Sequence, residues 1–253
     1  MSSLQSDYHE NAKFWLREKP TIQSDFLCRP HVFELLGDLK GKSVVDIGCG
    51  DGYVSRYVAT HGAFKTIGID VKESVVQEAK KLEEKEKLGI EYYVGSATKL
   101  SMVDDKSMDL ALSILVYVHF NSEEMDEATK EAARVLKPNG VFLLAVPHPL
   151  IYIAKPKTHW VTFTDEQKVN YFKDKVAHLI LHRPDEGKTE IQAIPVATHT
   201  LSEYFNNLLE NNFIIEKILE PEPTQQDLAT YLHMWGEETS LPIYLIIKAR
   251  KHA

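Results

Sequence analysis

The sequence contains little cysteine and no long apolar run. Among its 253 residues there are two cysteines, Cys28 and Cys49, whose spacing fits neither a zinc pair nor a disulfide scaffold. Because Cys49 lies within a cluster of glycines, we expect reduced thiols and a cytoplasmic location. No apolar stretch reaches the length that spans a membrane. The N-terminal residues also lack the basic start and apolar core of a signal peptide.

Positive charge is in deficit. There are 29 Lys and Arg residues against 37 Asp and Glu residues, giving a formal net charge of −8 at pH 7. Such a balance gives no overall attraction to nucleic acid or to an anionic membrane surface. With 43% apolar residues the chain can bury a substantial core. The composition predicts a single domain over residues 1–253, a monomer or homodimer, with neither nucleic acid nor membrane as its partner.

Short apolar segments alternate with segments of helical periodicity. The predicted strands are 43–47, 65–70, 90–95, 108–115 and 140–147, and the predicted helices between them are 52–62, 74–88 and 122–136, with 30–39 before the first strand. This alternation indicates an α/β fold with a parallel, doubly wound sheet. It stops at Pro147 and resumes with a helix at 202–211 and strands at 213–219 and 241–249. We therefore expect seven mostly parallel strands, with residues 148–200 inserted as a cap over the ligand crevice.

The first predicted strand runs into a glycine cluster, VVDIGCGDGYVSR at 44–56. Glycine allows the backbone to turn sharply and to approach a ligand closely. Asp70 ends the next strand, where an acid can accept both hydroxyls of a ribose. The spacing is G-x-G-x-G, whereas a dinucleotide site has G-x-G-x-x-G. Asp46 and Asp51 flank the turn, and acids repel a pyrophosphate but suit an ammonium or sulfonium cation.

These motifs resemble those of the class I S-adenosylmethionine-dependent methyltransferases, the Rossmann-like group, most strongly over residues 30–147. VVDIGCGDG is similar to the first motif of the family, and IGID is similar to the second. VGSATKL at 94–100 is similar to the adenine-binding motif. MDLALSILVYVHF is similar to the fourth strand, and EAARVLKPNGVFLLAVP is similar to the helix, turn and fifth strand that follow. The resemblance implies S-adenosylmethionine as cofactor and a direct in-line displacement of its methyl group.

The resemblance also implies a set of cofactor contacts. The residues at the matching positions are Asp46, Gly48, Cys49, Gly50, Asp70, Val71, Ala97, Ser113 and Ile114. Asp70 would bind the ribose, and Ser113 and Ile114 would border the sulfonium. Where the family often has an acid for the adenine amino group this chain has Ser96, a weaker acceptor. In an N-terminal helical lid, residues 1–29, Tyr8 would cover the methionine end and Arg29 would pair with its carboxylate.

Methyl transfer needs orientation and desolvation, and a base only where the nucleophile arrives protonated. Histidine is suited to that role near neutral pH. His119 follows the fourth strand and His148 the fifth, so both are candidate catalytic residues. The candidate substrate contacts are Tyr117, His119, His148, Tyr152, Trp160 and His199. The spacing of histidines and carboxylates fits no common metal site, so we expect no metal.

The sequence thus predicts an S-adenosylmethionine-dependent methyltransferase acting on an oxygen or nitrogen atom of a small molecule. Two alternatives stay open at this point. One is a nicotinamide-dependent oxidoreductase, which the glycine spacing disfavours. The other is a non-catalytic partner subunit that keeps the fold and the cofactor site.

Overall fold

A computed structural model describes residues 22–155, 161–164, 169–173, 175–183, 189–190, 194–224 and 241–252. Within them a seven-stranded sheet has the order β10-β11-β5-β4-β1-β2-β3. Its strands are β1 (Ser43–Ile47), β2 (Lys65–Asp70), β3 (Glu91–Val94), β4 (Met108–Ile114), β5 (Leu136–Pro147), β10 (Phe213–Leu219) and β11 (Tyr244–Lys251). Strands β1 to β5 pair in parallel, and β11 is antiparallel to both of its neighbours. The predicted mostly parallel, doubly wound sheet is confirmed.

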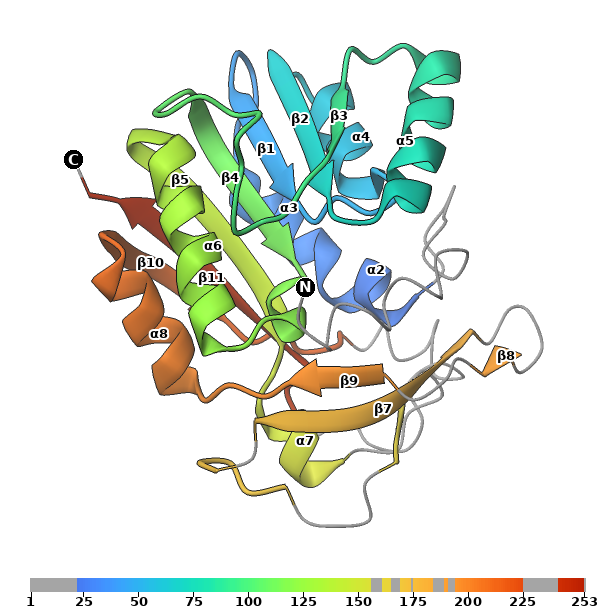
Figure 1. The fold of residues 1–253 in the computed structure, drawn as a ribbon, viewed down its shortest axis with the longest axis vertical. Helices are drawn as coiled ribbons and strands as arrows, with labels where there is room; N and C mark the ends of the chain where they lie inside the picture. The colour runs from blue at the N-terminus through green and yellow to red at the C-terminus, as the bar shows by residue number, and fades with distance from the viewer. Residues whose placement is uncertain are drawn as a thin grey trace.

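Helices cover both faces of the sheet (Figure 1). They are α3 (Arg29–Leu36), α4 (Tyr53–Thr60), α5 (Glu73–Glu86), α6 (Ser122–Val135) and α8 (Leu201–Glu210). Successive strand residues point to opposite faces. Val44 and Leu112 therefore pack with α3 and α4, whereas Val45 and Ala111 pack with α6 and α8. Burial on both faces explains why these strands are apolar throughout instead of alternating with polar residues.

The strand order reverses between β1 and β4. From β1 the chain continues outward to β2 and β3, and then returns to β4 on the other side of β1. In doubly wound sheets, the loops after the two strands at such a reversal diverge and leave a crevice at the carboxyl ends of the strands. This geometry places the ends of β1 and β4, and the loops after them, around one ligand site.

The segment after β5 forms a second, smaller antiparallel sheet. It contains α7 (Leu150–Ala154), β6 (Val161–Phe163), β7 (Val176–Arg183), β8 (Thr189–Glu190) and β9 (Ile194–Ala197). β7 pairs with β6, β8 and β9. Figure 1 shows β7, β9 and α7 beyond the ends of β4 and β5, on the side to which the strand arrows point. The inserted sheet thus lies beside the crevice; its strands were not predicted from the sequence.

The described part of the chain begins at Ile22. A short helix, α2 (Gln23–Leu27), follows and lies directly before α3. Of the N-terminal helical lid predicted over residues 1–29, residues 1–21 lie outside the described residues. Within the described part of the chain, every helix is too short or too polar to cross a membrane.

Burial in β11 gives a test of the fold. Ile247 is completely buried in this strand and packs on the α6 and α8 side of the sheet. We expect Ile247→Ala to lower the free energy of unfolding by about 2–5 kcal/mol, because it removes apolar contacts and leaves a cavity. Urea denaturation followed by circular dichroism measures this loss. Ile218→Ala in β10, at a side chain 45% exposed, is the matched control. Equal losses in the two variants would contradict the interior position of β11.

Candidate functional site

Three glycines shape the turn that follows β1. Gly48, Gly50 and Gly52 have φ values of 77°, 55° and 80°, in the left-handed region that favours glycine. The Gly48 amide donates to the Ile69 carbonyl of β2 at 2.7 Å. A Cβ at Gly48 would lie 2.2 Å from Cγ2 of Val116. The turn is therefore fixed between β2 and the loop after β4, with no room for a side chain at Gly48.

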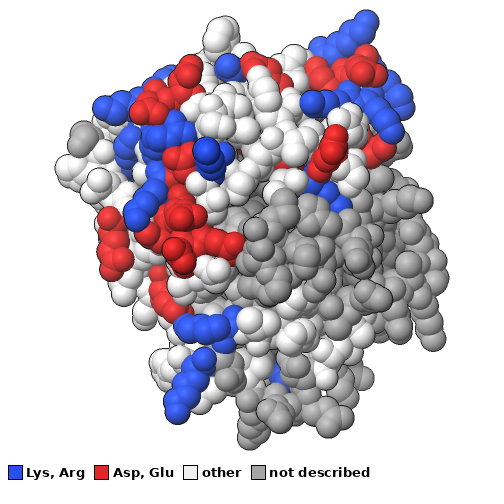
Figure 2. Space-filling view, viewed as in Figure 1, with Lys and Arg blue, Asp and Glu red and all other residues white. Residues whose placement is uncertain are grey.

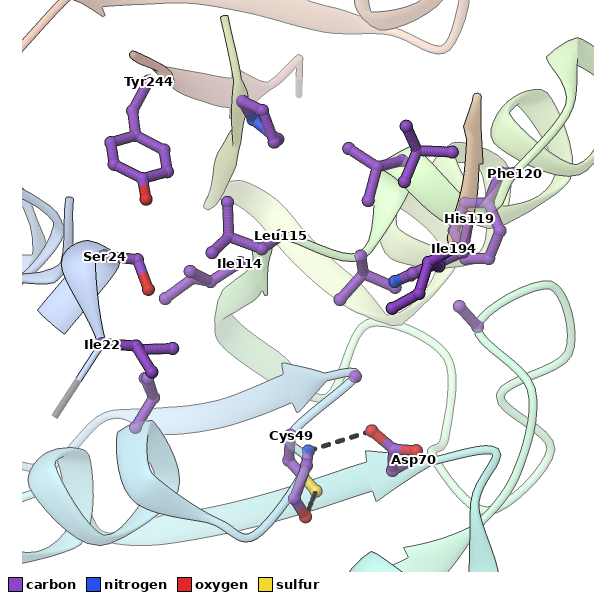
Figure 3. Close-up of a pocket in the computed structure, with 18 of the residues that line it drawn as sticks. Ile22, Ser24, Cys49, Asp70, Ile114, Leu115, His119, Phe120, Ile194 and Tyr244 are labelled. Atoms are coloured by element: carbon purple, nitrogen blue, oxygen red, sulfur yellow. Dashed lines mark hydrogen bonds between the residues drawn. The ribbon is translucent and has the colours of Figure 1, made fainter. Parts of the chain in front are cut away.

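Asp70 joins the ends of the first two strands. Its Oδ2 accepts a hydrogen bond from the Gly50 amide at 2.9 Å (Figure 3). Its Oδ1 accepts one from the Lys72 amide at 2.9 Å. The side chain is buried, and its carboxylate lines the same cavity as the glycine turn. Two backbone amides thus set the position of an acid that lines the cavity.

Two more acids are buried at the turn. Asp46 accepts a hydrogen bond from the Ser55 hydroxyl at 2.7 Å, and Asp51 accepts one from the Tyr53 amide at 3.2 Å. Burial raises the pKa of Asp46 to about 6, although the Ser55 hydrogen bond acts in the opposite direction. A site that concentrates carboxylates in this way favours a cation over a phosphate group.

A cavity of about 230 Å³ connects the glycine turn with the inserted sheet. Its polar end is lined by Arg29, Asp46, Gly48, Cys49, Gly50, Asp70, Val71, Ser96 and Ala97, and its apolar end by Ile114, Leu115, Val118, His119, Phe120, Ile151, Tyr152, Leu179, Ile194 and Val196. Figure 3 shows Cys49 and Asp70 on one side of this space, Tyr244 and Ser24 on another, and His119 with Ile194 on a third. The cavity therefore joins a nucleoside-type cradle to an apolar chamber.

Comparisons with known proteins agree with this geometry. Residues 45–144 match the family model of a methyltransferase domain. A structure of a candidate S-adenosylmethionine-dependent methyltransferase from Listeria monocytogenes is similar with a TM-score of 0.68 and 27% identity, covering 89% of this chain and 96% of that chain. The chain belongs to the class I S-adenosylmethionine-dependent methyltransferases.

Two sequence relatives carry more specific names. The ubiquinone biosynthesis O-methyltransferase of Pelagibacter ubique is 36% identical over 107 residues, 42% of each chain. The demethylmenaquinone methyltransferase of Lactococcus lactis is 33% identical over 160 residues, 61% of this chain and 60% of that enzyme. The methyltransferase therefore covers less than two thirds of either relative.

The residues of the polar end fit S-adenosylmethionine, the cofactor of this class, which supplies an electrophilic methyl group on a sulfonium. The buried acids of the turn oppose a pyrophosphate and suit a cationic ligand. A Cβ built at Gly50 would meet nothing within 4 Å, so the backbone there is open to a ligand. Gly48, Cys49 and Gly50 would hold the methionyl part, and Asp70 would hold the ribose.

The two alternatives from the sequence, a nicotinamide-dependent oxidoreductase and a non-catalytic partner subunit, are set aside. The family and its cofactor are those of a methyltransferase.

Arg29 and Ser96 are engaged by neighbouring protein groups. The Arg29 guanidinium lies 2.9 Å from Asp25 and also donates to the Ser24 hydroxyl. Ser96 Oγ lies 2.9 Å from Thr98 Oγ1 and accepts a hydrogen bond from the Thr98 amide at 3.2 Å. Both residues nevertheless line the cavity. Their contacts with the cofactor stay predictions, and Tyr8 lies outside the described residues.

The last residue of β4 lines the cavity, and the residue before it does not. Ile114 lines it, whereas Ser113 is fully buried and does not. Ser113 pairs in register with Leu144, which belongs to the core on the α6 and α8 side. Because adjacent strand residues point to opposite faces, the predicted border position fits Ile114 and not Ser113.

His119 lies in the 3₁₀ turn η2 (Tyr117–His119), directly after β4. Its side chain lines the apolar end of the cavity (Figure 3). Burial lowers the pKa of His119 to about 4. The imidazole is therefore neutral at physiological pH, and its low pKa makes it a weak proton acceptor.

His148 is placed elsewhere. Its side chain is 1% exposed, with Nε2 at 2.8 Å from Glu220 Oε1, and the Leu150 amide donates to its Nδ1 at 3.2 Å. Both ring nitrogens thus face protein groups, and His148 is not among the residues that line the cavity. The structure separates His148 from the acceptor site predicted for it, since the chain turns into α7 directly after Pro149.

Tyr117 and His199 also lie outside the cavity. The Tyr117 hydroxyl lies 3.0 Å from Thr129 Oγ1, and His199 Nε2 lies 2.9 Å from the Phe120 carbonyl oxygen. Both side chains are buried in protein contacts, which explains why neither reaches the acceptor space. Of the remaining predicted contacts, Tyr152 lines the cavity and Trp160 lies outside the described residues.

Sequence reasoning did not identify Gln23, Ser24 and Tyr244, which also line the cavity. The Tyr244 hydroxyl donates to Gln23 Oε1 at 3.3 Å. Tyr244 pairs with Pro147, so the start of the antiparallel β11 lies at the edge where the parallel strands end. An antiparallel assignment for the last strand would have located Tyr244. No motif marks Gln23 or Ser24.

Replacement of Asp70 tests the cofactor site. We expect Asp70→Ala to weaken S-adenosylmethionine binding by about 100-fold, because a charged acceptor of hydrogen bonds is lost. Titration calorimetry measures the affinity. Asp109→Ala is the matched control, since Asp109 also accepts from a backbone amide, that of Ser43 at 2.8 Å, at the opposite edge of the sheet. Unchanged affinity in Asp70→Ala would refute the site.

The raised pKa of Asp46 predicts a pH dependence of cofactor binding. Below pH 6 this carboxyl is largely protonated, and above pH 6 it is an anion beside the turn. A cationic cofactor therefore binds more tightly as the pH rises from 5 to 7, by up to about tenfold. We expect Asp46→Asn to remove this rise. Calorimetry of S-adenosylmethionine across this range measures it, and the same rise in wild type and Asp46→Asn would exclude Asp46 as its source.

Proposed function

We propose that this methyltransferase transfers the methyl group of S-adenosylmethionine, by direct in-line displacement, to an oxygen or nitrogen atom of an uncharged, apolar small molecule. The observation that carries the proposal is the continuity of the cavity. The cofactor cradle opens into an apolar space formed jointly by the loop after β4, α7 and the inserted sheet.

We call this space the acceptor chamber and define it by Val118, His119, Ile151, Tyr152, Leu179, Ile194 and Val196. Ile194 and Val196 come from β9, and Leu179 comes from β7. The described residues of the chamber include no Lys, Arg, Asp or Glu. An ionised acceptor would lose its hydration there without gaining an opposite charge from them, which is strongly unfavourable. The chamber therefore suits an acceptor that enters uncharged.

His119 is the group we assign to proton removal. A protonated oxygen or nitrogen nucleophile loses its proton as it bonds to the methyl carbon, while the sulfur–methyl bond breaks and its electron pair returns to sulfur. His119 is neutral, lines the chamber and lies directly after β4. Because bonding to the methyl carbon makes that proton strongly acidic, even this weak base can accept it and pass it to solvent after the product leaves. Tyr152 contributes an aromatic wall, consistent with a flat acceptor.

The named relatives support a small-molecule acceptor. One belongs to ubiquinone biosynthesis and is an O-methyltransferase, and the other acts on demethylmenaquinone. The face of the molecule in Figure 2 offers no continuous basic surface among the described residues, which a nucleic-acid site usually needs. Lys and Arg alternate with Asp and Glu over α5, and Asp and Glu predominate over α6.

Transfer of labelled methyl into a cell extract tests the function. We expect the label to enter a small molecule that partitions into organic solvent at pH 7, because the chamber selects an uncharged acceptor. Mass spectrometry then identifies the product. Asp70→Ala is the control for enzymes of the extract, and His119→Gln should lower the rate by about 100-fold, a usual contribution of a general base. Label in precipitated protein or nucleic acid would refute the proposal.

A further inference from the structure

The turn that carries His119 is anchored from outside the cavity. η2 is a single 3₁₀ turn, closed by hydrogen bonds from the His119 amide to the Val116 carbonyl at 2.9 Å and from the Phe120 amide to the Tyr117 carbonyl at 3.2 Å. Such short turns have poor hydrogen-bond geometry and little stability of their own. The position of His119 therefore depends on what holds the two ends of the turn.

His199 holds the C-terminal end. Its Nε2 lies 2.9 Å from the Phe120 carbonyl oxygen, and its ring packs edge-on against Tyr204 with centroids 5.3 Å apart. The side chain is 4% exposed, and burial lowers the pKa of His199. A neutral imidazole carries one N–H, and this geometry directs it to the carbonyl of Phe120. Without that donor a buried carbonyl would be left unsatisfied, which is destabilising.

Tyr117 holds the N-terminal end. Its hydroxyl lies 3.0 Å from Thr129 Oγ1 in α6, and the Thr129 hydroxyl lies 2.5 Å from Asn207 Oδ1 in α8. All three side chains are buried. The turn is therefore connected to both helices on this face of the sheet. We call the two contacts, His199 with Phe120 and Tyr117 with Thr129, the η2 clamp.

His199 also follows β9 directly. Ile194 and Val196 of β9 face the acceptor chamber, and the chain reaches His199 after Thr198. The hydrogen bond to Phe120 thus fastens the inserted wall of the chamber to the turn that carries His119. Two walls that are distant in sequence keep a fixed spacing through this contact.

We propose that His199 is a positioning residue for methyl transfer, which holds His119 in the wall of the acceptor chamber through the Phe120 carbonyl. The proposal rests on the function proposed above only in the role given to His119. The clamp itself can be tested without any acceptor.

The test compares two replacements of His199. His199→Gln keeps an N–H at a similar distance from the backbone, and His199→Met has a similar length and no donor. We measure the titration of the His119 imidazole by NMR in the S-adenosylhomocysteine complex, assigning its signal by its loss in His119→Gln. In wild type and His199→Gln we expect a midpoint near pH 4. In His199→Met the loosened turn admits water, and the midpoint should rise by at least about one unit towards the ordinary value.

A normal His119 midpoint in His199→Gln would show that the N–H donor of residue 199 matters, and not only the volume of its side chain. An unchanged His119 midpoint in His199→Met, or an equal rise in both variants, would overturn the proposal. If His199→Met does not fold, His199→Phe makes the same test, because it keeps a ring against Tyr204 and has no donor for the Phe120 carbonyl, and the midpoint should again rise. A His119 midpoint that rises in His199→Met but not in His199→Gln supports the clamp. This result does not depend on the acceptor, so labelled methyl in a macromolecule would refute the proposed function and leave the clamp standing.

Discussion

The hydrogen bond between the Gly50 amide and Asp70 is the contact on which the cofactor site depends. It joins the turn after β1 to the end of β2, and the Lys72 amide fixes the second carboxylate oxygen. Parallel strands bring their carboxyl ends to one edge of the sheet, but the pairing of the strands does not fix the position of the loops that follow. The hydrogen bond to Asp70 fixes the position of the glycine turn. The same atoms that shape the cradle are thus those available to a ribose.

The cavity combines two environments that a displacement reaction requires. At its polar end buried carboxylates favour a cation. Burial raises the pKa of Asp46 to about 6, so the negative charge of this end increases as the pH rises through 6. At its apolar end the wall is formed by side chains of the core and of the inserted sheet. Under the proposed function, a charged electrophile would be stabilised where it binds, and the acceptor would meet it among apolar side chains. These side chains would keep water from competing as the nucleophile.

The sequence predicted the sheet well because its strands arise from local patterns. The glycine turn and Asp70 lie at the ends of β1 and β2 as expected, and their contacts with the cofactor stay predictions. An apolar run indicates a strand, a glycine cluster indicates the turn after it, and Asp70 marks the end of the next strand, all without reference to distant parts of the chain. The acceptor residues were less predictable, because their direction depends on packing between distant segments. His119 and Tyr117 are two residues apart, yet one lines the cavity and the other bonds to Thr129. His148 is likewise turned towards Glu220, a residue of the chain after β10.

The loop after β4 is where the cofactor cradle and the acceptor chamber meet. Val116 packs against Gly48 so closely that a Cβ there would clash, and four residues later the Phe120 carbonyl contacts His199. Between them lies His119. The same loop therefore contacts the glycine turn and carries the side chain that we propose as the proton acceptor. Substitutions in β7 or β9 alter the chamber wall without touching Gly48 or Asp70, so acceptor preference can change while the cradle stays intact.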